Sequence, residues 1–273
     1  MTSFAPRHLQ EHAQSSLVLA ELEQIARPPI ELEVVIPAYN EEDRLATTIA
    51  RTAELLAARP WSSRIVVVDN GSVDATPSMA QARAADLEGV PVEVIGCAQS
   101  GKGAAVRRGV LTSRAEYVGY MDADLATPIE ALDGVMNHFD DGADVVVGSR
   151  RAPGAEFAVP PSRTRRAGTA LFSNIGRRLA PGISDTQCGF KFFRGPTGRQ
   201  LIQRCRTEGF AFDLELLALA IRQGCDVREL PVRWTAQPGS TFRPLRDGVP
   251  SFASGLQLLS TMGRTEAGVE RSE

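Results

Sequence analysis

Cysteine is scarce in this sequence, with four residues among 273. No two of them are close enough along the chain to give the paired spacing that metal sites use. A few scattered thiols in a chain of this length are typical of a protein kept in a reducing compartment. This argues against a disulfide-stabilised framework and predicts reduced, mostly buried side chains at Cys97, Cys188, Cys205 and Cys225.

Long apolar runs are missing as well. No stretch approaches the roughly 20 apolar residues that a membrane-spanning helix needs, and the segment MTSFAPRHLQEHAQ lacks the hydrophobic region of a signal peptide. The net charge of -3 provides no overall attraction to nucleic acid. With 43% apolar and 23% charged residues, the composition is that of an ordinary globular protein, and we expect a cytoplasmic one.

Short β-branched apolar runs alternate with helical patterns between residues 31 and 150. The run Val34, Val35 and Ile36 is typical of a strand buried on both faces. Similar runs follow in RIVVVDNGS, VPVEVIG, EYVGYMDAD and ADVVVGSR, separated by helical patterns at 41–58, 74–86, 102–114 and 128–139. These alternations predict a Rossmann-like α/β fold, with a mostly parallel sheet and helices on both faces.

The second part of the chain is patterned less regularly. Residues 151–166 have the composition of a loop, helices are expected at 167–180, 212–223 and 249–262, and CGFKFFR and DVRELPVRW are expected to be strands. An amphipathic helix is expected at 9–26. We predict one domain at 31–248, with halves at 31–150 and 151–248. It lies between an N-terminal helical extension at 1–30 and a C-terminal helix and tail at 249–273.

Polar residues follow three of the predicted strands at the point where each one ends. Ligands bind at the carboxyl ends of strands in open parallel sheets, so these residues should line one pocket. They are Pro37, Ala38, Tyr39, Asn40 and Glu41 after the first strand, Asp69, Asn70, Gly71 and Ser72 after the second, and Asp122 and Asp124 after the fourth.

Asp122 and Asp124 are separated by a single alanine. Two carboxylates this close repel each other unless a cation neutralises them. Mg²⁺ and Mn²⁺ bind in this way, using one or two carboxylates together with substrate phosphates. The alternative is a pair of solvated turn acids or helix caps before Pro128. Asp69 is placed to accept a hydrogen bond from a base or ribose, and its alternative role is that of an ordinary turn residue.

The segment from Gly96 to Gly103 nearly matches the phosphate-binding loop of nucleoside triphosphatases. However, Gly103 replaces the Ser or Thr that would bind Mg²⁺, and the loop follows the third strand and not the first. These differences argue against a triphosphatase. Lys102 still has a function in such a loop, because a cation at the start of a helix can meet a diphosphate.

Arginines gather after the fifth strand, at Arg150, Arg151, Arg163, Arg165 and Arg166. Guanidinium groups suit phosphate oxygens, so they predict an anion site. The alternative is a solvated basic loop, whereas nucleic acid fits poorly because no aromatic side chains are interleaved.

Two further acids, Asp213 and Glu215, lie at the expected start of a helix. Their alternative role is to stabilise the helix dipole from the first turn.

Together these segments resemble the family 2 glycosyltransferases. The likeness in the first half is carried by VVIPAYNEEDRL, VVVDNGSVDAT, GKGAAVRRG, MDADLATP and VVVGSR. In the second half, DTQCGFK, GFAFDLE and ELPVRW resemble the dolichyl-phosphate glucosyltransferases and the related polyprenyl-phosphate mannosyltransferases. The resemblance covers about residues 32–245.

The resemblance implies a GT-A fold and a transfer that inverts the anomeric centre, with Mg²⁺ or Mn²⁺ as cofactor. Two departures stand out. We expect no counterpart of the N-terminal membrane helix of the eukaryotic enzymes, and Ala126 stands where many relatives have glutamine, which leaves the number of protein ligands to the metal open. The implied site residues are Pro37, Ala38, Tyr39, Asn40, Glu41, Asp69, Lys102 and Asp122 for the nucleotide sugar, Asp122 and Asp124 for the metal, Arg150 and Arg163 for the acceptor phosphate, and Asp213 at the position of the base in hydroxyl-using relatives.

The acceptor determines whether a general base is needed. A hydroxyl needs a carboxylate to take its proton, whereas a lipid phosphate is already ionised. The arginines and DTQCGFK favour the phosphate, so we expect transfer of a hexose, glucose from UDP-glucose being favoured over a GDP-sugar, to a polyprenyl phosphate at the inner membrane face. A terminal helix could touch the bilayer there. The alternatives are a transferase acting on a small natural-product acceptor and, from another class, a nucleotidyltransferase.

Overall fold

The computed structural model describes residues 29–157, 174–209, 211–235 and 253–261. The expected helix at 9–26 lies outside these ranges, as do Arg163, Arg165 and Arg166, most of the loop expected at 151–166 and much of the helix expected at 167–180. Within the described ranges, no helix is long and apolar enough to cross a membrane. All four cysteines are free thiols, two buried and two partly buried.

Seven strands form one mixed sheet in the order β3-β2-β1-β4-β7-β5-β8. Every neighbouring pair is parallel except those that β7 makes with β4 and β5. A second, two-stranded sheet pairs β6 with β9. The strands are β1 (Leu32–Ala38), β2 (Ser63–Asp69), β3 (Val92–Gly96), β4 (Tyr117–Met121), β5 (Val145–Ser149), β6 (Glu156–Phe157), β7 (Phe190–Arg194), β8 (Val227–Pro231) and β9 (Arg233–Trp234).

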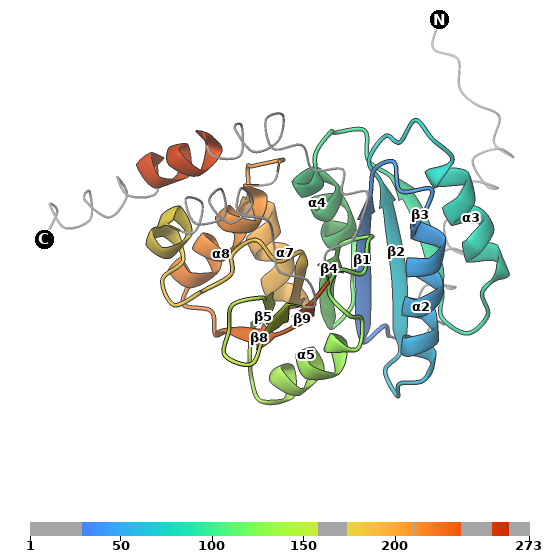
Figure 1. Cartoon of the computed structure of the whole chain (residues 1–273), viewed down its shortest axis with the longest axis horizontal. Coiled ribbons are helices and arrows are strands. Elements are labelled where there is room, and N and C mark those ends of the chain that lie inside the picture. Colours follow the sequence, from blue (N-terminus) through green and yellow to red (C-terminus); the bar gives the residue numbers. More distant parts are fainter. Residues whose placement is uncertain (1–28, 158–173, 210, 236–252, 262–273) are drawn as a thin grey trace, which may run out of the picture.

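Helices cover both faces of the large sheet (Figure 1). One face carries α2 (Leu45–Ala57), α3 (Thr76–Asp86) and α5 (Ala131–Asp140), and the other carries α4 (Lys102–Thr112), α7 (Gly195–Arg204) and α8 (Phe212–Arg222). Further helical turns lie at 174–179 and 253–261, and they pack through Ile175, Leu258 and Leu259 beside α8. The predicted α/β fold with a mostly parallel sheet is confirmed.

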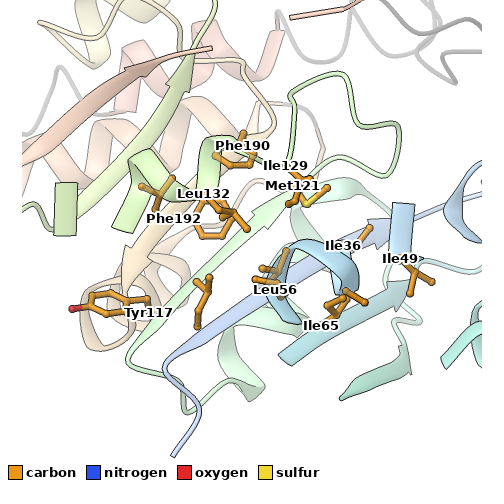
Figure 2. Close-up of a cluster of buried hydrophobic side chains, with 14 of the residues drawn as sticks. Ile36, Ile49, Leu56, Ile65, Tyr117, Met121, Ile129, Leu132, Phe190 and Phe192 are labelled. Atoms are coloured by element: carbon orange, nitrogen blue, oxygen red, sulfur yellow. The ribbon is translucent and has the colours of Figure 1, made fainter. Parts of the chain in front are cut away.

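The two-sided burial of β1 explains why its sequence is apolar without alternation. Val34 and Ile36 point into the core beneath α2, α3 and α5, whereas Val35 points into the core beneath α4, α7 and α8. All three side chains are fully buried, and burying each one stabilises the fold by about 1.5–3 kcal/mol. Figure 2 shows part of the first core, where Ile49 and Leu56 of α2 lie over the sheet.

The chain differs from the expectation in its second half. The strand CGFKFFR runs antiparallel and inserts between β4 and β5, which local patterning does not reveal. Helix α7 was not predicted, because Gly195, Pro196 and Gly198 obscure it, although proline is compatible with the first turn of a helix. The expected strand DVRELPVRW is divided into β8 and β9, which belong to different sheets. The domain boundaries at 30, 150 and 248 stay predictions.

Candidate active site

One edge of the large sheet gathers the residues that the sequence singles out. Strands β1, β2, β4 and β5 run in the same direction, so their carboxyl ends meet at this edge. Strand β7 runs the opposite way and therefore begins there. The segment before β7 lies beside the segment after β4, and the backbone N–H of Asp122 donates to the carbonyl of Gly189 at 2.9 Å.

The turns after β1 and β2 hold each other in place. Asn40 has a positive φ of 54°, its N–H donates to Ser72 Oγ at 3.0 Å, and its Oδ1 accepts from Val73 N–H at 3.0 Å. Asp69 ends β2, and its Oδ1 accepts from Ser72 N–H at 3.3 Å. Tyr39 is 47% exposed at the same turn. A large aromatic surface and a carboxylate thus lie together where a nucleoside was expected.

Pro37 and Ala38 belong to the last residues of β1, with Ala38 buried. Glu41 follows, and its N–H donates to Thr76 Oγ1 at 2.7 Å. These contacts fix the chain direction after β1, and with it the placement of Tyr39 and Glu41.

Asn70 connects this region with the start of α4. Its Nδ2 donates to the Gln99 carbonyl at 2.6 Å, and its Oδ1 accepts from Gly101 N–H at 2.7 Å. The turn that carries Lys102 is therefore fastened to the end of β2. The near-match to a phosphate-binding loop forms part of this same edge and is not a separate site.

Three acids form a group with unfavourable mutual charge: Glu41, Asp122 and Asp124. Burial chiefly, and then repulsion by Asp122, raises the pKa of the Asp124 carboxyl. Burial also raises the pKa of Glu41 to about 7; Arg44 opposes this shift, and repulsion by Asp124 and Asp122 adds to it. Such a group attracts a cation.

The acid group fits a divalent metal that shares its coordination with a substrate. Within the described parts of the chain, no three His, Cys, Asp or Glu side chains form a complete metal-binding set. Mg²⁺, however, is usually bound through one or two carboxylates, with phosphates and waters completing its octahedron. Asp122, whose side chain is 44% exposed, and Asp124 supply oxygen ligands of this kind.

Gly189 allows Asp122 to occupy its position. A Cβ built on Gly189 would overlap the carboxylate of Asp122. The glycine is thus required by close approach and not by an unusual backbone angle. It lies within DTQCGFK, so part of that motif serves to position the first aspartate of the Asp-Ala-Asp segment.

Lys102 joins two of the predicted site residues. Its Nζ lies 2.7 Å from Asp122 Oδ1 and 3.6 Å from Asp213 Oδ2. Asp213 is only 2% exposed. Its Oδ1 accepts from Lys191 Nζ at 2.6 Å and also from the hydroxyl of Tyr120. The structure therefore brings together Lys102, Asp122 and Asp213 and adds two buried partners.

These partners set the charge of Asp213. Burial by itself would raise the pKa of the Asp213 carboxyl, but Lys102, Lys191 and the hydroxyl of Tyr120 outweigh it and hold the pKa below its ordinary value. Asp213 is thus a stabilised anion. Its role as a proton acceptor stays a prediction.

Arg150 lies at the end of β5 in a second paired group. Its Nε and Nη2 donate to the two carboxylate oxygens of Asp185 at 2.6 and 2.8 Å, and its guanidinium lies 5.7 Å from the centre of the Trp234 ring. Glu229 fixes the neighbouring backbone by accepting from Asp185 N–H at 3.1 Å and from Ser184 N–H at 2.9 Å. Burial would raise the pKa of Asp185, but Arg150 lowers it to about 2.

No role was assigned from the sequence to several residues of these networks, among them Tyr120, Lys191, Asp185 and Gly189. Tyr120 and Lys191 lie inside apolar strands, where only the unusual polar residue in a buried run could have signalled them. Asp185 and Gly189 belong to the quoted DTQCGFK motif. Arg163 lies outside the described residues, so its role stays a prediction.

Comparison with known proteins identifies the family. Residues 33–196 match the family described as glycosyl transferase family 2. The chain belongs to this family. That membership favours a sugar transferase over the nucleotidyltransferase alternative.

Several similar curated relatives belong to one branch of the family. A dolichyl-phosphate beta-glucosyltransferase of Drosophila melanogaster is 34% identical over 251 residues, which cover 86% of this chain and 76% of the relative. The human protein of the same name is 32% identical over 230 residues, covering 80% and 71%. The resemblance to the dolichyl-phosphate glucosyltransferase branch is confirmed.

Solved structures support the GT-A fold. Glucosyl-3-phosphoglycerate synthase from Mycobacterium tuberculosis, in complex with Mn²⁺, UDP and glucosyl-3-phosphoglycerate, aligns with a TM-score of 0.63 at 19% identity, covering 86% of this chain and 80% of that one. Mannosyl-3-phosphoglycerate synthase from Rubrobacter xylanophilus aligns with a TM-score of 0.59 at 19% identity, covering 86% and 75%. At this identity the likeness concerns the fold alone.

Proposed function

We propose that this glycosyltransferase moves glucose from UDP-glucose to a dolichyl or other polyprenyl phosphate, with inversion at the anomeric carbon. The observation that carries the proposal is the similarity to dolichyl-phosphate beta-glucosyltransferases, at 30–34% identity over 86% of the chain in two of them. The site geometry is consistent with it, because acids, a lysine and an arginine converge on one sheet edge.

The donor would lie over the ends of β1, β2 and β4. Tyr39 and Asp69 offer an aromatic surface and a hydrogen-bond acceptor for the nucleoside. Lys102 lies beside Asp122, where its ammonium group would meet the diphosphate. We favour UDP over GDP as the nucleotide because the similar relatives are glucosyltransferases.

The leaving diphosphate needs positive charge as its bond to the sugar breaks. Asp122 and Asp124 would hold Mg²⁺ or Mn²⁺, which acts as a Lewis acid toward the leaving phosphate oxygen. Lys102 would add a second positive charge at the same place. Preorganised charge of this kind is usually the largest contribution to catalysis.

The acceptor phosphate would be oriented from the β5 side. Arg150 is held by Asp185 and Trp234, so its guanidinium is preorganised. Arg163 is proposed to bind the acceptor phosphate together with Arg150. An ionised phosphate oxygen can attack the anomeric carbon without losing a proton, so this acceptor needs alignment and no general base. Attack from the face opposite the leaving diphosphate inverts that carbon.

A polyprenyl acceptor requires the enzyme to work at a membrane surface. We therefore propose peripheral contact with the inner face of the membrane, in keeping with the expected cytoplasmic location. The helical turn at 253–261, with Leu256 48% exposed, is one candidate for that contact.

Transfer assays with labelled sugars test the proposal. The purified protein is incubated with UDP-glucose, GDP-mannose or UDP-galactose, with dolichyl phosphate in detergent and Mn²⁺. We expect label in a lipid product from UDP-glucose, accompanied by UDP release, and a β-linkage by NMR. Release of UDP with no label in the lipid would contradict the proposed acceptor.

A further inference from the structure

A buried charged group lies beneath the proposed diphosphate position. Lys191 and Tyr120 are completely inaccessible to solvent, and Asp213 is nearly so. The ammonium of Lys191 donates to Asp213 Oδ1 at 2.6 Å and to the carbonyl of Cys188 at 2.5 Å. A buried charge is tolerated only when it is paired and hydrogen-bonded, so these three side chains form one fixed unit.

Lys102 links this buried unit to the site. Its side chain is 15% exposed, and its Nζ lies between Asp122 Oδ1 and Asp213 Oδ2. The same Nζ lies 5.6 Å from the centre of the Tyr120 ring. A lysine has a long, flexible stem, and here the buried carboxylate of Asp213 restrains its end in addition to Asp122.

Helix α8, which carries Asp213, also supports the backbone around Lys102. Glu215, on α8 like Asp213, accepts from the N–H groups of Arg206 and Thr207 at 3.0 and 2.7 Å. The next residue, Glu208, accepts from Gly103 N–H through its carbonyl at 2.7 Å. Glu215 therefore holds the segment that contacts the turn presenting Lys102, whereas Asp213 contacts the Lys102 side chain itself.

We propose that Asp213 is a positioning residue for Lys102 and not a proton acceptor. Held by Lys191 and Tyr120, it places the ammonium of Lys102 where the donor diphosphate is to bind, and so contributes to donor affinity. This inference rests on the proposed function, because it assumes that a nucleoside diphosphate is the ligand.

The contacts of Asp213 make its carboxylate a poor general base. A general base must reach the proton of the acceptor and then carry it. In Asp213, Oδ1 already accepts from Lys191 and Tyr120, and Oδ2 faces Lys102. Protonation would remove a negative charge that two ammonium groups share, which is costly in a buried site.

A double-mutant cycle on nucleotide affinity tests the inference. UDP binding is measured by calorimetry, with and without Mn²⁺, for the wild type, Asp213→Asn, Lys102→Gln and the double variant. We expect each single change to weaken UDP binding about 10-fold, in both conditions, and the double variant to bind no more weakly than Lys102→Gln. Asp226→Asn, which alters an exposed ion pair on the same half, should bind as the wild type does.

A result in which Asp213→Asn binds UDP normally but transfers sugar at a greatly reduced rate would overturn the inference. Additive losses in the double variant would do so too. If the wild type bound no UDP in either condition, the proposed function itself would have failed. Normal wild-type binding with an unaffected Asp213→Asn variant removes only the inference.

A gentler variant covers the event that Asp213→Asn does not fold. Tyr120→Phe keeps the ring and removes one donor to Asp213. For a positioning residue, we expect UDP binding to weaken a few-fold while the pH–rate profile stays in place. For a base, losing that donor would raise the carboxyl pKa and move the acidic limb of the profile upward, a result that contradicts the inference.

Discussion

Two groups of carboxylates at one edge of the sheet are treated in opposite ways by the fold. Asp124 and Glu41, beside Asp122, have raised pKa values, because burial and neighbouring negative charge both disfavour ionisation. Asp185 and Asp213 are more deeply buried, yet their pKa values are lowered, because arginine and lysine partners compensate for burial.

The difference shows which acids have their negative charge balanced by cationic side chains of the protein itself. Arg150 pairs with Asp185, and Lys191 and Lys102 surround Asp213, so these acids are suited to hold cationic side chains in place. Lys102 pairs with Asp122 and Arg44 pairs with Glu41, but the three acids of this group still outnumber these two cations. The group is therefore suited to a cation that arrives with the substrate. Solvent exposure and the balance of cationic partners, and not the residue type, therefore distinguish the acids that can bind a metal from the acids that hold cationic side chains.

The largest effect should come from neutralising the acid group. The double change Asp122→Asn and Asp124→Asn removes the charge that would hold the metal, so we expect glucosyl transfer to fall about 1,000-fold or more. The initial rate of labelled lipid formation measures it. Asp86→Asn, at the far end of α3, is the matched control and should transfer at the wild-type rate. Retained transfer in the double variant would remove the distinction between the two groups.

Breaking a paired acid should instead reduce stability. Asp185→Asn leaves Arg150 buried with a weaker partner, so we expect the free energy of unfolding to fall by about 3 kcal/mol. Urea denaturation at neutral pH measures the change. Asp226→Asn breaks the exposed pair with Arg228 and should cost less than about 1 kcal/mol. Equal losses in the two variants would contradict the distinction.

The effect of Asp185 has a defined pH range. Its pKa in the folded protein is about 2, below the ordinary value of 3.8, so its ionised form favours folding. This contribution is fully present above about pH 4 and is lost as the pH falls toward 2. The difference between wild type and Asp185→Asn should therefore shrink over that interval in acid denaturation curves.

A third change tests how the two groups are connected. Gly189→Ala places a methyl group on the carboxylate of Asp122, so we expect the carboxylate to move and transfer to fall about 100-fold. Thermal melting should show that the fold survives. Gly96→Ala, where a Cβ meets no atom within 4 Å, is the control. An unchanged rate in Gly189→Ala would show that the placement of Asp122 does not depend on this contact.

The smallest effect concerns Glu41. Its pKa of about 7 lies above the ordinary 4.5, so its contribution to stability is present below pH 4.5 and is lost as the pH rises through 7. Glu41→Gln should remove this dependence. We expect the free energy of unfolding of the wild type to fall by about 1–2 kcal/mol relative to the variant between pH 5 and pH 8, because solvent at the Glu41 side chain screens part of the effect. Parallel pH–stability curves for the two proteins would contradict the prediction.

Much of the fold could be predicted because it depends on local patterning. The runs at β1, β2, β4 and β5 are buried on both faces, and their apolar residues are visible in the sequence. Helix α7 was missed because its glycines and proline hide a helix whose apolar residues, Leu201 and Ile202, are few. The insertion of β7 between β4 and β5 could not be predicted, because strand order depends on contacts between distant segments.

The candidate site divides in the same way. Asp69, Asp122 and Asp124 were predicted because each follows a recognisable strand. The partners of Asp213 were not, since Lys191 and Lys102 are far from it in sequence and Lys191 lies within an otherwise apolar strand.

The sequence by itself determined the alternation of strands and helices, the family, and which acids end the strands, because these depend on neighbouring residues and on recurring motifs. Only the tertiary structure decided which charges meet. The antiparallel β7 brings Gly189 to Asp122 and Lys191 to Asp213, and charge interactions depend on distance and burial, which the order of residues does not contain.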